Sequence, residues 1–172
     1  TIFPVISEAV RGTKITVGAP FFNQINIPIG LIPLFLTGVG PLLAWRNTSK
    51  ESLIKNFTFP LIVAFIIVGL LLALDITGNA MMTLSLSGFV FTTIVIEFWR
   101  GIRARTRKFD ESIISAFIKL IQKNRSRYGG YISHLGIVLM FVGFSGHAFD
   151  IEDEWGLQIG AKETVGNYEI EL

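Results

Sequence analysis

The chain has 172 residues, of which 51% are hydrophobic and only 16% are charged, whereas a soluble domain carries about 25% charged residues. This balance indicates a membrane protein. The sequence contains no cysteine, which excludes disulfide frameworks, cysteine-ligated zinc sites and thiol nucleophiles.

Residues 1–26 are expected to form an outer, amphipathic segment. Apolar side chains recur at helical spacing from Phe3 to Val10, and Gly12 follows them. Such a pattern is typical of a helix that rests at a membrane interface. An ordinary loop outside the membrane is the alternative.

Four apolar stretches follow, each close to the ~20 residues that a helix needs to cross a bilayer. They cover about residues 27–45, 57–74, 80–99 and 131–149. Proline and glycine, including Pro33 and Pro41, interrupt the first stretch, and neighbouring helices must then satisfy the backbone groups that the prolines free. The sequence therefore predicts an all-α integral membrane protein whose four-helix transmembrane region spans residues 27–149.

The basic residues predict how these helices are oriented. Two connecting loops, 46–56 and 100–128, hold 12 of the 15 lysines and arginines. By the positive-inside rule both loops are cytoplasmic. Segments 1–26 and 150–172 are then periplasmic, at the outer face of a bacterial inner membrane. The acidic segment 150–172 looks truncated, and it ends in an alternation that indicates a short β-strand.

An amphipathic pattern lies within the loop 100–128. Its apolar positions form one helix face: Ile113, Ile114, Phe117, Ile118 and Ile121. We expect a helix that lies on the inner membrane surface as an anchor. A binding site for anionic lipid or for a partner stays open as the alternative. The basic run 100–108 is explained by topology, so no nucleic-acid partner is expected.

Both histidines of the chain lie in or beside the last apolar stretch. His134 and His147 are separated by about 20 Å on one helix, at ~1.5 Å per residue, so they cannot bind the same metal ion. His134 is in the apolar layer and needs a donor, an acceptor or a metal. A neutral imidazole is a common axial ligand of haem iron. Alternatively, His134 is part of a helix-packing seam and bonds to a Ser or Thr of the third stretch.

Glycines 129, 136 and 143 recur every seven residues in the same stretch. Small residues in this pattern allow close approach by a helix or by a flat macrocycle. We therefore expect open space beside His134.

Glu97 is the other ionisable residue near the end of an apolar stretch. It is expected to pair with Arg100 or Arg103. Alternatively, these two arginines contact a carboxylate-bearing ligand such as the haem propionates, because the guanidinium fork matches a carboxylate. Familiar enzyme motifs, such as a phosphate-binding loop or a nucleophile elbow, are missing from the sequence, and no catalytic residue is assigned.

Three ordered blocks resemble the CcmF/NrfE family, the haem-lyase membrane subunits of System I cytochrome c maturation. They are residues 17–23 (VGAPFFN), 38–46 (GVGPLLAWR) and 127–136 (RYGGYISHLG). The resemblance covers essentially the whole chain and points to the C-terminal portion of that family.

The resemblance implies a role in passing haem from a haem chaperone to apocytochrome c. It also implies a b-type haem in the membrane, with His134 as one axial ligand and the second ligand outside this chain. The transferred haem is then a substrate. Implied partners are the remaining N-terminal part of the protein, either on one polypeptide or as a split subunit, the haem chaperone, apocytochrome c with its thiol-handling proteins, and membrane lipid.

The chain departs from the family pattern in two places. A tryptophan-rich, haem-docking segment is absent from these 172 residues. Where some relatives carry an outer-face histidine ligand, this chain has Ser7, and His147 is the other outer-face candidate. Two further hypotheses stay open. One is a multi-span transporter with His134 in an ion- or proton-coupled site, favoured by the interrupted first stretch. The other is a purely structural membrane subunit.

Overall fold

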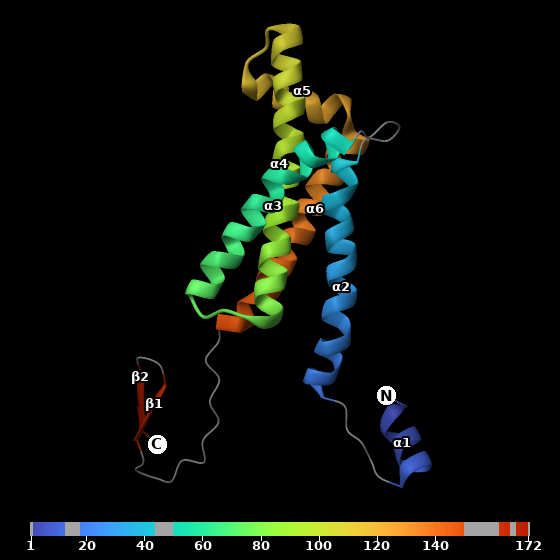
Figure 1. The fold of residues 1–172 in the computed structure, drawn as a ribbon, viewed down its shortest axis with the longest axis vertical. Helices are drawn as coiled ribbons and strands as arrows, with labels where there is room; N and C mark the ends of the chain where they lie inside the picture. The colour runs from blue at the N-terminus through green and yellow to red at the C-terminus, as the bar shows by residue number, and fades with distance from the viewer. Residues whose placement is uncertain (1, 13–17, 44–49, 150–161, 166–167, 172) are drawn as a thin grey trace.

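The computed structural model describes residues 2–12, 18–43, 50–149, 162–165 and 168–171. The elements in these ranges are α1 (Phe3–Arg11), α2 (Ala19–Leu42), α3 (Lys50–Ala73), α4 (Gly78–Phe109), α5 (Ile113–Lys123), α6 (Arg125–Phe144), a 3₁₀-helix η1 (Ser145–Phe149), β1 (Lys162–Val165) and β2 (Tyr168–Glu171). Helix α4 is central, because α2, α3, α5 and α6 all pack against it (Figure 1). The bundle is therefore organised around one helix.

Within the described ranges, three helices are long and apolar enough to cross a membrane: Phe21–Leu42 in α2, all of α3, and all of α4. They correspond to the first three predicted spans. The fourth predicted span, 131–149, is α-helical only as far as Phe144 and continues as η1. Helix α6 does not reach the same hydropathy, because it opens with Arg125, Arg127 and two glycines.

Helix α2 begins eight residues earlier than the predicted first span and is not broken by its prolines. Pro20 lies in its first turn, where a missing N–H leaves no helical hydrogen bond unmade. Three further prolines, Pro28, Pro33 and Pro41, lie inside the continuous helix. Gly38 allows a close approach to α4, since a Cβ at this position would meet the Phe89 ring at 2.8 Å and a Val90 methyl at 2.9 Å. This packing supports the helix across its prolines.

Helix α4 also extends beyond its predicted end at Trp99. Its 32 residues correspond to about 48 Å at ~1.5 Å per residue, well beyond the ~30 Å thickness of a bilayer core. The helix ends where Asp110 takes a left-handed conformation (φ 52°), and the Asp110 N–H donates to the Thr106 carbonyl at 3.0 Å. The predicted loop 100–128 is thus mostly helix, formed by the end of α4, by α5 and by the start of α6.

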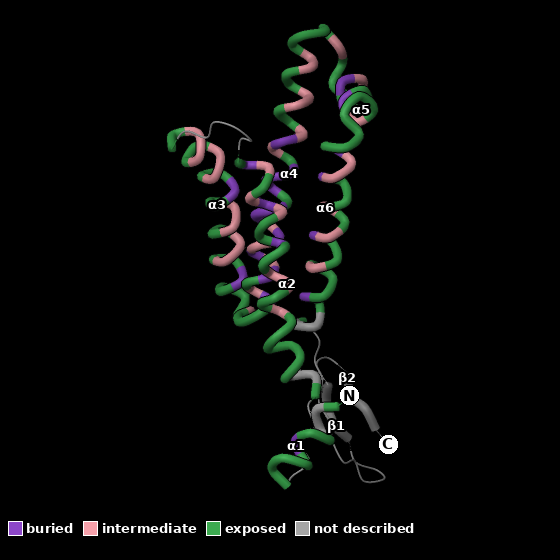
Figure 2. Tube along the Cα trace, turned by 90° about the vertical axis from the view of Figure 1, so that its right-hand side faces the viewer, coloured by how far each residue is buried: buried purple, intermediate pink, exposed green. Residues whose placement is uncertain are grey.

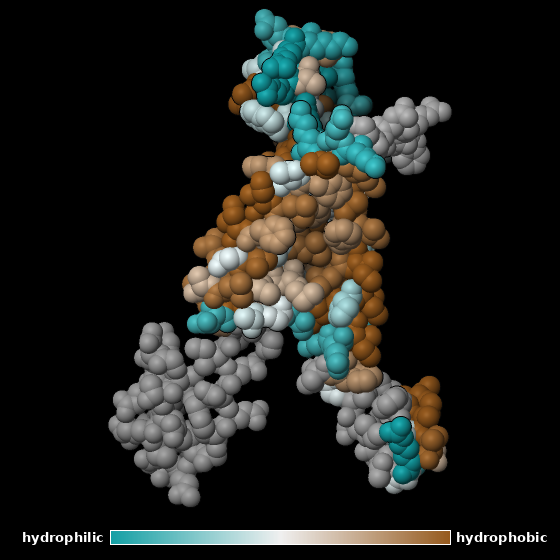
Figure 3. Space-filling view, viewed as in Figure 1, coloured by the Kyte–Doolittle hydropathy of each residue, from teal (hydrophilic) through white to brown (hydrophobic). Residues whose placement is uncertain are grey.

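The core of the bundle lies along α4. Phe89 is 3% exposed, and its ring lies 6.3 Å from that of Phe35 in α2 and 6.2 Å from that of Phe57 in α3. Figure 2 shows buried positions concentrated on α4, while α3 is mostly intermediate or exposed. Figure 3 shows, on the face in view, an apolar surface across the middle of the bundle and a hydrophilic cap at one end. This distribution is the one a lipid-facing bundle requires.

Helix α1 and the hairpin of β1 and β2 lie outside this bundle. Helix α1 matches the predicted helical pattern and ends at Gly12, which has φ 70°. Strands β1 and β2 pair antiparallel, with Lys162 opposite Glu171 and Val165 opposite Tyr168. Neither element contacts the bundle within the described ranges (Figure 1).

Candidate functional site

His134 lies on the inner side of α6. Arg127 is seven residues before His134, Tyr131 is three residues before it and Val138 is four residues after it, so all lie on one helix face. Tyr131 and Val138 are buried. The His134 ring is half-buried, and its Nδ1 atom is buried with no hydrogen-bond partner among the described residues. The bond to a Ser or Thr of α4 that the packing-seam alternative requires is therefore not made within this part of the chain. Thr93 instead donates its hydroxyl to the Phe89 carbonyl at 3.0 Å.

The glycines do not open space beside His134, contrary to our expectation. A residue two positions away on a helix is rotated by about 200°, so Gly136 lies on the opposite side of α6. A Cβ added at Gly129, Gly136 or Gly143 would meet nothing within 4 Å. This glycine face is thus an outward surface of the bundle, and His134 lies on the inward side.

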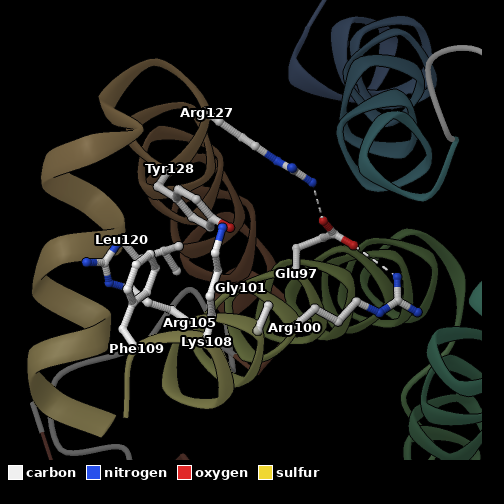
Figure 4. Close-up of a pocket in the computed structure, with 10 residues that line it drawn as sticks. Glu97, Arg100, Gly101, Arg105, Lys108, Phe109, Leu120, Arg127 and Tyr128 are labelled. Atoms are coloured by element: carbon white, nitrogen blue, oxygen red, sulfur yellow. Dashed lines mark hydrogen bonds and ion pairs between the residues drawn. The ribbon is translucent and has the colours of Figure 1, made fainter. Parts of the chain in front are cut away.

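Glu97 is a buried carboxylate at the centre of an ion-pair cluster near the start of α6 (Figure 4). Its side chain is 7% exposed, and Arg100 Nη1 donates to Oε1 at 3.0 Å while Arg127 Nη2 donates to Oε2 at 2.7 Å. The pair with Arg100 confirms one of the two predicted partners. Arg100 also reaches Asn56 Oδ1 at 2.7 Å, and Arg127 Nε donates to the Tyr131 hydroxyl at 3.1 Å.

This cluster joins three helices through one carboxylate. Asn56 comes from α3, Glu97 and Arg100 from α4, and Arg127 and Tyr131 from α6. A buried carboxylate is stable only when it is paired and hydrogen-bonded. The two guanidinium groups meet that requirement, and they leave the cluster with a net positive charge.

The two arginines predicted to contact propionates differ in their surroundings. Arg100 is occupied by Glu97 and Asn56. Arg103 is exposed, and its side chain makes no ion pair with a described residue. A ligand carboxylate at Arg100 must therefore compete with Glu97. At Arg103 it would meet no competing carboxylate among the described residues.

The remaining predicted positions lie away from His134. His147 falls within η1, thirteen residues further along the chain, and its side chain lies outside the described residues. Ser7 is on α1 and is buried. Within the described ranges, no group of three or more His, Asp or Glu side chains is placed to hold a bare metal ion.

A second charged cluster was not anticipated from the sequence. Glu111, between α4 and α5, receives Arg105 Nε at 2.8 Å and Lys119 Nζ at 2.8 Å. Hydrogen bonds from Arg105 and then Lys119 lower the pKa of Glu111 from 4.5 to about 2. The acid is six residues from one partner and eight from the other, spacings that fall outside the i, i+3 and i, i+4 pairs of a single helix.

The partner of Glu97 on α6 was also missed, since Arg127 is thirty residues away in sequence. A signal was available in the predicted topology. Both residues lie at the basic end of adjacent antiparallel spans, so they are at the same depth. Only the packing of α6 on α4 brings them into contact.

Comparison with known proteins gives relatives along nearly all of the chain. It is 23% identical over 173 residues to the cytochrome c-type biogenesis protein CcmF of Haemophilus influenzae, covering 100% of this chain and 26% of that protein. It is 28% identical over 181 residues to CycK of Rhizobium meliloti, covering 99% of this chain and 25% of that protein. It is 24% identical over 181 residues to NrfE of Haemophilus influenzae, covering 98% of this chain and 25% of that protein.

This chain spans about a quarter of the length of these curated relatives, and the match falls on their C-terminal portion. No family model matches the sequence. No solved structure matches it either. The similarity to CcmF, CycK and NrfE proteins over almost the whole chain confirms the predicted resemblance to the CcmF/NrfE family of cytochrome c-type biogenesis proteins.

Proposed function

We propose that this chain is the C-terminal part of a membrane protein of cytochrome c maturation and that His134 binds a b-type haem. The observation that carries the proposal is the unpartnered, buried imidazole nitrogen of His134, in a chain whose relatives are cytochrome c-type biogenesis proteins. A buried polar atom without a partner is costly. A ligand or another part of the protein therefore has to complete this site.

The imidazole of His134 fits an axial haem ligand. Since Nδ1 is the buried nitrogen, Nε2 is the one available to iron. A ligating histidine normally donates its other N–H to an acceptor that fixes the ring orientation. The described residues offer none, so we assign both this acceptor and the second axial ligand to the part of the protein that this chain lacks. Bound there, the haem supplies one-electron redox chemistry.

The residues around His134 set its position and depth. Tyr131, one turn earlier on the same face, is 8% exposed and receives a hydrogen bond from Arg127. Arg127 in turn pairs with Glu97 of α4. These bonds hold the start of α6 against α4 and therefore keep the imidazole turned inward. Of the two arginines considered for a propionate, Arg103 is the one without a carboxylate partner within the described ranges, whereas Arg100 is paired with Glu97.

The membrane arrangement that goes with this function has four spans, α2, α3, α4 and α6. The basic ends of α3, α4 and α6, together with α5, lie on the cytoplasmic side of a bacterial inner membrane by the positive-inside rule. Both chain ends are then periplasmic, where haem is passed from a haem chaperone to apocytochrome c. The resulting activity is of the haem-lyase type, with the transferred haem as substrate.

The transporter alternative is weaker than the sequence suggested. Its support was an interrupted first span, and α2 is a continuous helix from Ala19 to Leu42. No unwound segment of the kind that forms a midplane ion site is present in the described part of α2, α3 or α4.

The proposal is tested by the absorption spectrum of the whole protein, purified with its remaining N-terminal part. We expect a b-type spectrum in the wild type and its loss in His134→Ala. His147→Ala is the matched control and retains the spectrum, because His147 lies in η1, beyond the far end of α6 from the cluster around Glu97. An unchanged spectrum in His134→Ala would rule out the ligand assignment.

A further inference from the structure

A cavity of about 520 Å³ opens between α4, α5 and α6 at the basic end of the bundle. Four cationic side chains line it, Arg100, Arg105, Lys108 and Arg127 (Figure 4). Tyr128 and Leu120 contribute its aromatic and aliphatic wall. The cavity combines a strongly positive lining with an apolar wall.

Its positive charge is only partly neutralised. Glu97 is shared between Arg100 and Arg127, and Glu111 between Arg105 and Lys119. Each acid thus faces two cations. Lys108 makes no ion pair with a described residue, and its Nζ lies 5.4 Å from the centroid of the Phe109 ring. The cavity therefore keeps an excess of positive charge that suits an anion.

An exposed apolar surface lies on the helix that forms one wall of this cavity. Helix α5 buries Ala116 and Leu120 towards the bundle, while Ile113, Ile114 and Ile118 are 59%, 74% and 48% exposed. Two views at right angles show α5 lying crosswise to the long axis (Figures 1 and 2). A helix in this orientation with one apolar face is suited to lie in the membrane interface.

We propose that this cavity binds the phosphate headgroup of an anionic phospholipid, with its acyl chains along the exposed face of α5. Guanidinium and ammonium groups match phosphate oxygens, and basic pockets between helices at the cytoplasmic face are suited to such headgroups. A soluble phosphate would use the cations but leave the α5 surface uncovered. The joint presence of both features selects the lipid.

The test is lipid binding by the delipidated whole protein in neutral detergent. The probes are short-chain phosphatidylglycerol, phosphatidylcholine of the same chain length, and glycerol 3-phosphate. We expect phosphatidylglycerol to bind at least about tenfold more tightly than phosphatidylcholine, since several basic residues attract its anionic headgroup. Equal affinity for the two lipids would overturn the proposal. Binding of glycerol 3-phosphate as tight as that of phosphatidylglycerol would overturn its lipid part.

A pair of charge reversals on α4 localises the site. Lys108→Glu removes a cavity cation that has no carboxylate partner, and it is expected to weaken phosphatidylglycerol binding by at least about tenfold. Arg107→Glu makes the same change in net charge next to it at a residue that does not line the cavity, and it should change the affinity less than about threefold. Equal losses of phosphatidylglycerol affinity in the two variants would show that the lipid is attracted by net charge alone, and this would contradict the proposal.

The lipid site is independent of the haem assignment. His134→Ala should leave phosphatidylglycerol binding unchanged, because His134 is not part of the cavity lining. A parallel loss of lipid binding in His134→Ala would contradict a separate lipid site, whereas loss of the b-type spectrum alone concerns only the haem.

Discussion

Helices α3 and α4 lie side by side, and they place their apolar residues in opposite ways. In α3 only Pro60 and Leu71 are buried, and large apolar side chains such as Phe65, which is 71% exposed, face outwards. Helix α4 buries ten residues, and six of them are polar: Thr83, Ser85, Ser87, Thr92, Thr93 and Glu97. The more apolar helix is thus the more exposed one.

This difference is the one expected of a bundle that lies in lipid. In a bilayer, apolar side chains gain little by turning inwards, because lipid is as apolar as the protein interior. Small and hydroxyl-bearing residues allow helices to approach closely. The Ser85 and Ser87 hydroxyls have no partner among the described residues, whereas threonine hydroxyls of α4 bond to their own helix backbone. Thr92 and Thr93 do so, donating to the carbonyls of Gly88 and Phe89. The central position of α4 is therefore explained by close packing between helices and not by the hydrophobicity of its side chains.

The largest effect is expected from truncating matched phenylalanines on the two helices. Phe89→Ala removes a buried ring of α4, and we expect it to lower the free energy of unfolding by about 2–3 kcal/mol. This is less than the ~3–5 kcal/mol typical of soluble cores, because only the packing and cavity part is lost in lipid. Phe65→Ala should have almost no effect. Both are measured by unfolding of the intact protein in detergent, and equal losses would contradict the contrast between the buried α4 and the exposed α3.

Removing a carboxylate from each helix sharpens the comparison. Glu97→Ala leaves Arg100 and Arg127 without their shared acid, and hydrogen bonds to charged groups contribute about 1.5–3 kcal/mol. Both arginines are half exposed and can turn to water, so a loss of about 2 kcal/mol is expected. Glu51→Ala, on the exposed first turn of α3, is the control and should be neutral. If Glu97→Ala is equally neutral, the cluster does not hold α4 and α6 together.

The smallest effect concerns the C-terminal end of α4, where it packs against α5. The pKa of Glu111 is lowered from 4.5 to about 2 by Arg105 and Lys119, so its contribution to stability is fully present above pH 4.5. That contribution is lost as the pH falls from 4.5 towards 2. We expect the unfolding midpoint to decrease between pH 6 and pH 3 by more in the wild type than in Glu111→Gln. Identical pH profiles would show that this cluster does not hold α5 against α4.

The candidate site shows where sequence reasoning reached its limit. The sequence identifies His134 because burying an ionisable side chain in an apolar stretch is unfavourable. It identifies Glu97 because this residue lies at the end of such a stretch. Which side of α6 faces inwards was predicted less well. The seven-residue glycine repeat suggested a face beside His134, whereas helical rotation places Gly136 about 200° away. Tyr131 and Val138, which are buried, identify the inward face.

The sequence by itself determined the membrane class, the three apolar helices α2, α3 and α4, the amphipathic α5 and the resemblance to cytochrome c biogenesis proteins, because composition, hydropathy and local spacing are properties of neighbouring residues. Only the tertiary structure decided that α4 is central, that α2 continues through its prolines, and that Glu97 pairs with Arg127 thirty residues away. These features depend on contacts between helices. In lipid such contacts are selected by close packing and charge pairing, which leave little periodic trace in a single sequence.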